Sequence, residues 1–204
     1  MTGKSEVDPR STSARSAKLI TEVLAPSVVI VLLSLAMAWR ATEYRIWPAL
    51  LWASVVATFS AALPMAFIVR GARAGRWDSH HVNDREGRAL PLLVCFGSTA
   101  VGLTIMWLGN APQPMIAMAV TMLAVLVATG IITVWWKVSM HAAVSAGGVA
   151  MLAALYHPAV LALLAVVALI CWSRVAIRHH TAGQVCVGAL VGFAVSAAVF
   201  VPLH

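Results

Sequence analysis

Charged residues are scarce in this chain of 204 residues, and their scarcity excludes a soluble fold. Only 10% of the residues are charged and 61% are apolar, and the mean hydropathy is +0.91. Soluble domains contain about 45–50% apolar and roughly 25% charged residues. Because a soluble domain of this size cannot enclose so many apolar side chains, we expect the chain to lie in a bilayer.

Cysteine is also sparse, and its spacing excludes a thiolate metal site. The three cysteines, Cys95, Cys171 and Cys186, form no CxxC pair or other metal-ligand spacing. All three lie in apolar runs or at their edges. We therefore interpret them as small buried apolar residues.

Apolar runs long enough for transmembrane helices, about 20 residues each, recur along the chain. They predict an all-α polytopic transmembrane helix bundle of about six to seven spans. A proline at Pro158 favours two short spans over one of about 30 residues, which at roughly 45 Å would exceed a hydrocarbon core of about 30 Å. Residues 1–18 are polar and serine-rich, and we expect them to form a disordered cytoplasmic tail. The seven expected spans are 19–39, 47–69, 90–108, 115–136, 142–155, 159–172 and 181–203.

The basic residues are distributed unevenly between the two sides of this topology. The chain has 14 Lys plus Arg against 7 Asp plus Glu, a net charge of +7. With seven spans, only Arg40 and Arg45 fall on the side opposite the N-terminus. The positive-inside rule then places the N-terminus and the basic loops in the cytoplasm. The excess of basic residues is thus explained by the orientation of the protein in the membrane. We therefore expect no nucleic-acid partner.

Three loops on the basic side also carry histidine: DSHHVNDREGR at 78–88, KVSMH at 137–141 and SRVAIRHH at 173–180. Arginine binds phosphate oxygens in pairs and stays charged at all relevant pH values. Two histidines from different loops can divide the tasks of nucleophile and general acid without a metal. The ordinary alternative is that the arginines anchor helices to headgroups and the histidines lie at a wet interface.

The spacing around the second and third loops favours a phosphate site. If the last helix starts near His179, His180 and Gln184 lie on one helix face, and Gln184 can hold the imidazole. Ser139 and His141 open the fifth span, where free backbone N–H groups favour an anion.

The third loop resembles a motif of the type 2 phosphatidic acid phosphatase superfamily, which includes the vanadium haloperoxidases. That family's third motif is S-R-x5-H-x3-D. The segment SRVAIRHHTAGQ matches it at Ser173, Arg174 and His180, with Gln184 in place of the aspartate.

The other two family motifs are matched less fully, in the family's order along the chain. The second, P-S-G-H, is similar to VSMH, which matches at Ser139 and His141. The first, K-x6-R-P, is similar to HVNDREGRA, which matches at Arg88, with His81 where lysine is expected. The resemblance covers roughly half of the chain, from about residue 80 to 184.

The resemblance implies a set of roles. His180 would attack phosphorus to form a phosphohistidine, and His141 would protonate the leaving oxygen. Arg88 and Arg174 would bind the nonbridging oxygens, and Ser139 would add a hydrogen bond.

The departures from the family pattern shift some of these roles. Gln184 would orient His180 but stabilise its cation less than a carboxylate. His81 takes the position of the family lysine, and Lys137 or Arg85 would replace the lost phosphate contact. No metal or cofactor is expected.

We therefore expect residues 19–204 to form a transmembrane phosphatase-like domain in the cell membrane, with the site on its cytoplasmic face. A site at headgroup depth meets an amphiphile, so the expected substrate is a lipid-linked phosphate or diphosphate, polyprenyl lipids included. Two alternatives stay open. One is an inactive relative that binds or transports lipid phosphates. The other is a histidine–metal enzyme of the membrane hydroxylase type. Separately, Asp78, Asp84 and Glu86 could bind a metal with His80 and His81, although carboxylates among arginines are more often counter-ions.

Overall fold

The computed structural model of the protein describes residues 12–75 and 89–204, and every regular element in these ranges is helical. The predicted all-α class is thus confirmed. Helices α3, η1 and α4 run on from one another, as do η3 and α8. In chain order the elements are α1 (Thr12–Val23), α2 (Pro26–Ala41), α3 (Ile46–Ala57), the π-helical η1 (Thr58–Ala62), α4 (Leu63–Arg73), α5 (Ala89–Leu108), α6 (Gln113–Trp135), α7 (Met140–Leu155), the 3-10 helix η3 (Pro158–Leu163), α8 (Leu164–Ala176) and α9 (Ala182–Leu203).

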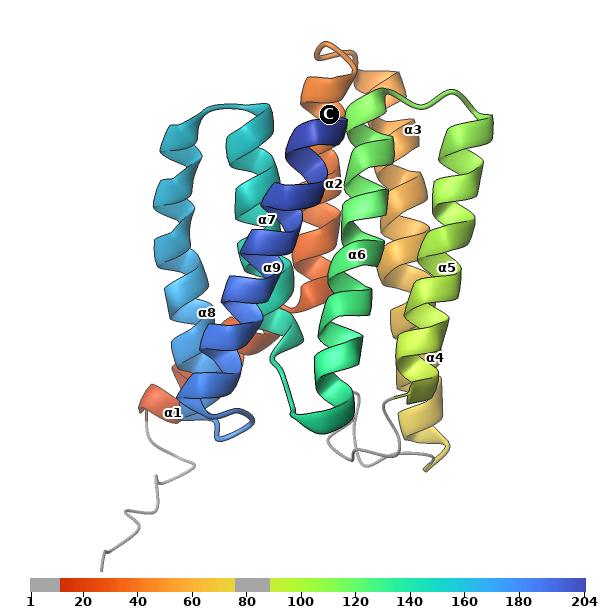
Figure 1. Ribbon diagram of the computed structural model, residues 1–204. Coiled ribbons are helices and arrows are strands. Elements are labelled where there is room, and N and C mark those ends of the chain that lie inside the picture. The colour runs from red at the N-terminus through yellow and green to blue at the C-terminus, as the bar shows by residue number, and fades with distance from the viewer. Residues whose placement is uncertain (1–11, 76–88) are drawn as a thin grey trace, which may run out of the picture.

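The helices have the lengths and the outer surface of a polytopic membrane bundle. Figure 1 shows them side by side, with loops at two ends. Large apolar side chains face outwards, among them Leu93 and Leu190, which are 67% and 68% exposed. Within the described ranges, five helices are long and apolar enough to cross a membrane: Ile46–Arg73, Leu90–Leu108, Gln113–Trp135, Pro158–Ala176 and Ala182–Leu203.

The first expected span, 19–39, is broken in the structure. Helices α1 and α2 meet at a bend of 48° and count as a sixth candidate span only if they are taken together. The break lies at Ala25, which is extended (φ −61°, ψ 150°) and precedes Pro26. The residue before a proline avoids helical geometry, which accounts for the break. In Figure 1, α1 lies across the foot of the bundle.

Part of the segment that we expected to be a disordered tail is helical. Helix α1 begins at Thr12, so residues 12–18 of the expected disordered tail are helical. Tertiary contacts explain the difference: Ala17 and Thr21 are buried, and the Thr21 hydroxyl lies 3.1 Å from the Ser173 hydroxyl of α8. Residues 1–11 of that tail lie outside the described ranges.

The fifth expected span is also distinctive. Helix α7 has 16 residues, about 24 Å at ~1.5 Å per residue, and is shorter than a hydrocarbon core of about 30 Å. Ten of its residues are buried, because α7 lies inside the bundle against α2 and α9. By length and composition the described chain thus has five or six candidate spans, and α7 is the shorter segment that would make seven.

Glycines bring α7 and α9 into close contact. A Cβ added to Gly192 would lie 2.1 Å from the carbonyl oxygen of Ala143, and one added to Gly188 would lie 2.6 Å from that of Ser139. The two glycines form a GxxxG pair, a sequence pattern that predicts close packing of helices in a membrane, and the close contact is present.

A π-helical turn joins α3 to α4. In a π turn the carbonyl of Phe59 would bond to the N–H five residues on, which is Pro64 and has none. The hydroxyl of Ser98 on α5 donates to this carbonyl instead. The turn thereby links α4 to α5.

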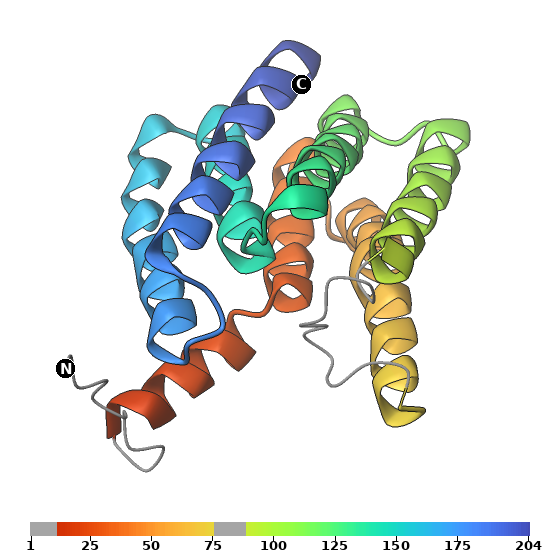
Figure 2. The same ribbon diagram turned by 60° about the horizontal axis from the view of Figure 1, so that its bottom comes forward.

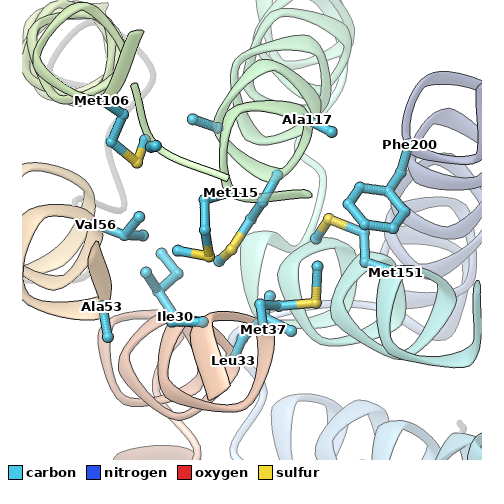
Figure 3. Packing of buried hydrophobic residues seen from close by; sticks show 14 of the residues in the cluster. Ile30, Leu33, Met37, Ala53, Val56, Met106, Met115, Ala117, Met151 and Phe200 are labelled. Carbon is cyan, nitrogen blue, oxygen red and sulfur yellow. The ribbon is translucent and has the colours of Figure 1, made fainter. Parts of the chain in front are cut away.

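A methionine-rich core fills the half of the bundle near the 109–112 loop. Met37, Met106, Met115 and Met151 pack there with Phe200, and all are at most 3% exposed (Figure 3). Met115, Met118 and Met122 recur at helical spacing in α6, which predicts packing roles for them. Met115 and Met118 are fully buried, and Met122 packs against the same core while it also lines a cavity in the other half of the bundle.

Candidate functional site

A cavity of about 580 Å³ occupies the half of the bundle that faces α1. Its wall is mostly apolar and comes from α2, η1, α4, α5, α6 and α7. Its charged residues and its histidines come from α1, residues 137–141, the end of α8 and the 177–181 segment. These segments lie at the lower end of the bundle in Figure 1, the end that comes forward in Figure 2. The charged residues and histidines are Glu22, Lys137, His141, Arg174 and His180.

The C-terminal end of α8 positions His180. Arg178 has a left-handed backbone (φ 57°), which ends the helix. The backbone N–H groups of His179 and His180 both donate to the carbonyl of Arg174, at 3.2 and 3.3 Å. This turn places His180 beside Arg174, six positions earlier in the chain.

Gln184 orients the imidazole of His180. Thr181 and Gln184 form a capping box at the start of α9, in which the Thr181 N–H donates to Gln184 Oε1 at 3.2 Å. His180 Nδ1 lies 3.2 Å from the same oxygen. An amide oxygen only accepts, so Nδ1 carries the proton and Nε2 of the neutral ring keeps its lone pair. The expected pairing of His180 with Gln184 is present.

The surroundings favour the neutral form of His180. Burial, as the largest cause, and the positive charges of Lys137 and Arg174 together lower its pKa from the usual 6.5 to about 3, against the opposing effect of the hydrogen bond to Gln184. The imidazole is therefore uncharged at neutral pH.

Arg174 is almost completely buried at 2% exposure. Its Nε and Nη1 have no hydrogen-bond partner within residues 12–75 and 89–204. Buried guanidinium N–H groups are costly to leave unsatisfied. A lining arginine with free donors is therefore suited to an anionic ligand.

Lys137 and Ser139 approach the site from the start of α7. Lys137 Nζ donates to the carbonyl of His179 at 2.8 Å, and Lys137 lines the cavity. Ser139 is fully buried and caps α7, its hydroxyl accepting from the N–H of Ala142 at 3.4 Å. Its own N–H donates to the carbonyl of Gln184 at 3.2 Å. Ser139 thus joins the segments that carry His141 and His180, and it is not part of the cavity lining.

Of the predicted site residues, Lys137, His141, Arg174 and His180 line the same cavity. Gln184 and Ser139 do not line the cavity, but Gln184 contacts His180 and Ser139 caps the helix that carries His141. Arg88, His81 and Arg85 lie outside the described ranges, as do the histidine and carboxylates of the metal alternative. Within those ranges, no three His, Cys, Asp or Glu side chains gather as a metal site.

Sequence reasoning missed Glu22, which lines the cavity and interacts electrostatically with Arg174. The available signal was a carboxylate inside the first expected span, 19–39, where a charge is costly without a function or a partner.

Comparisons of the chain with protein-family models, with curated proteins and with solved structures found no match. The class of the protein therefore follows from its fold, which is an all-helical bundle with several membrane-spanning candidates and a polar-ended cavity.

Proposed function

We propose that the protein is a membrane phosphatase that hydrolyses a lipid-linked phosphate or diphosphate. The observation that carries this proposal is the neutral His180, oriented by Gln184 and placed with Arg174 and His141 in one cavity. The resemblance of the SRVAIRHH and VSMH segments to phosphatase motifs supports the same function.

The chemistry follows from the tautomer of His180. Nε2 has the lone pair, attacks phosphorus and forms a P–N bond while the P–O bond to the leaving group breaks. The leaving group is the lipid alcohol of a monophosphate or the lipid phosphate of a diphosphate. Arg174 binds the nonbridging oxygens, and His141 gives its proton to the leaving oxygen. Water then attacks the phosphohistidine, His141 takes the water proton, and phosphate leaves.

The shape of the cavity supports a lipid substrate. Its apolar wall includes Ile30, Ile68 and Leu126, whereas its charged residues gather at one end. An amphiphile would place its phosphate at the charged end and its hydrocarbon against the wall. Further contacts to the phosphate are proposed from Arg88, His81 and Arg85, which lie outside the described ranges.

The direct test is phosphate release by the purified protein in detergent, with prenyl phosphate, prenyl diphosphate and phosphatidate as substrates. We expect release by the wild type and none by His180→Ala. If the wild type releases no phosphate from any of them yet binds them, the alternative function is supported: a protein that binds or transports lipid phosphates, in which Gln184 replaces a catalytic carboxylate.

We further propose that this end of the bundle faces the cytoplasm, in a multi-pass protein of the cell membrane. Ala159 is exposed near the start of η3 and Ala182 is exposed at the start of α9, so the two residues lie at opposite ends of the bundle. In a variant without native cysteines, Ala182→Cys should react with an impermeant thiol reagent only in opened cells, and Ala159→Cys also in intact cells. The reverse pattern would invert the orientation.

A further inference from the structure

Glu22 gives the charged end of the cavity a negative group. Among the described residues that line the cavity it is the only acid, and it lies close enough to Arg174 for an electrostatic interaction. A site built only for a phosphate dianion would gain nothing from a carboxylate beside its arginine, because like charges repel.

The position of Glu22 is held by the fold. Because of the bend before Pro26, α1 packs against the C-terminal end of α8, where the hydroxyls of Thr21 and Ser173 lie 3.1 Å apart. Each of these residues precedes a member of the charged pair, so the contact fixes Glu22 relative to Arg174. Thr21 and Ser173 are at most 1% exposed, which shows that the contact is part of the packed interior.

The charges in the cavity indicate what ligand would fit. Lys137 and Arg174 are cationic, His180 is neutral at neutral pH, and Glu22 is anionic. A phosphate monoester carries about −1.5 to −2 at pH 7. An ammonium group near the phosphate would bring the net charge of the headgroup to about −1, which balances the one excess positive charge of these four side chains.

From this arrangement we propose that Glu22 is a specificity-determining residue that selects lipid phosphates with an ammonium group close to the phosphate. The phosphate binds Arg174 and Lys137, and the ammonium binds the Glu22 carboxylate. The inference rests on the proposed function for its substrate class, but it concerns binding and can be measured without turnover.

A purely structural role for Glu22 makes a different prediction. If Glu22 only neutralises Arg174, its removal changes the binding of every phosphate ligand in the same direction. If it binds an ammonium group, its removal changes the preference between an aminated ligand and a plain one. The preference is therefore the quantity to measure.

The experiment uses two non-hydrolysable amphiphiles, dodecylphosphonate and its β-amino derivative. Their dissociation constants are measured by calorimetry on the detergent-purified full chain. We expect the wild type to bind the amino ligand about five- to tenfold more tightly, as for an ion pair of modest strength. Glu22→Gln should abolish this preference, chiefly by weakening the amino ligand. Glu43→Gln should keep it, because Glu43 lies in the turn at the other end of α2.

Equal binding of the two ligands by the wild type would overturn the proposal without reference to any variant. A preference that persists in Glu22→Gln would also overturn it. Failure of the proposed function is distinguishable from both: the wild type would show the preference for the amino ligand but release no phosphate from lipid phosphates.

Discussion

The side-chain oxygen of Gln184 accepts a hydrogen bond from the N–H of Thr181 and also lies 3.2 Å from Nδ1 of His180. One atom therefore stabilises the start of α9 and fixes the tautomer of the proposed nucleophile. This double role explains how a neutral side chain can serve where the phosphatase motif has a carboxylate. The Gln184 amide orients the imidazole of His180, and the charged groups of the site are supplied by other residues that line the cavity.

Substitution of Gln184 tests this double role. Gln184→Glu keeps the length of the side chain and both hydrogen bonds, and its charge stabilises the imidazolium that develops during attack. We expect phosphatase activity to be maintained or to rise. Gln184→Leu removes both bonds, and we expect at least a tenfold loss, equivalent to about 1.4 kcal/mol. Equal activity in Gln184→Leu and the wild type would contradict the orienting role.

The pKa of His180 predicts its reactivity at acidic pH. An imidazole reacts with diethyl pyrocarbonate only in its neutral form. With a pKa of about 3, His180 stays neutral as the pH falls from 7 to 5. An ordinary histidine with a pKa near 6.5 loses roughly tenfold or more of its neutral fraction over that range. Mass spectrometry of the modified peptide should therefore show a nearly constant rate for His180, whereas a model histidine peptide slows. Parallel slowing of both would contradict the lowered pKa.

Arg174 is expected to reduce the stability of the empty protein while it serves ligand binding. Its Nε and Nη1 are buried and lack a hydrogen-bond partner among the described residues. A buried donor left without a partner costs about 1–3 kcal/mol, and an apolar side chain of similar size removes that cost. We therefore expect Arg174→Met to keep or raise the Tm in detergent while its affinity for dodecylphosphonate falls at least tenfold.

Arg70→Met is the matched control, because Arg70 is exposed in the last turn of α4. It should change neither the Tm nor the affinity appreciably. A large drop in the Tm of Arg174→Met alone would show that the arginine is a structural residue with partners, and not a ligand-binding group.

The contact of α7 with α9 predicts opposite effects of two glycine substitutions. A Cβ at Gly192 would lie 2.1 Å from the Ala143 carbonyl oxygen, so Gly192→Ala must force the helices apart. We expect a loss of about 1–3 kcal/mol, typical of overpacking. Gly130→Ala meets nothing within 4 Å and should be neutral or stabilising by up to ~1 kcal/mol. Equal unfolding midpoints for the two variants would contradict the close packing.

The sequence allowed the helices and the Gly188–Gly192 contact to be predicted, because each follows from the spacing of residues along one helix. The pairing of His180 with Gln184 was predicted from a last helix starting near His179. In the structure α9 begins at Ala182, and the pairing comes instead from the Gln184 side chain that folds back in the capping box with Thr181. The position of Glu22 could not be predicted from spacing. It depends on the bend before Pro26 and on the contact of Thr21 with Ser173, 152 positions away. The capping role of Ser139 could not be told from a phosphate-binding role, because a serine is favoured both in the phosphatase motif and at a helix N-cap.

The two histidines of the proposed mechanism should differ in their dependence on the leaving group. His180→Ala removes the nucleophile, so we expect no turnover with any substrate. His141→Ala removes the proton donor, which matters when the leaving group is an alkoxide and much less when it is a phenol of low pKa. His141→Ala should therefore keep measurable activity on an aryl phosphate and lose it on a prenyl or alkyl phosphate. His204→Ala, at the opposite end of the bundle, is the control and should behave as the wild type. Phosphate release measured with both substrates distinguishes the roles, because full activity of His180→Ala on either one would refute the phosphohistidine mechanism.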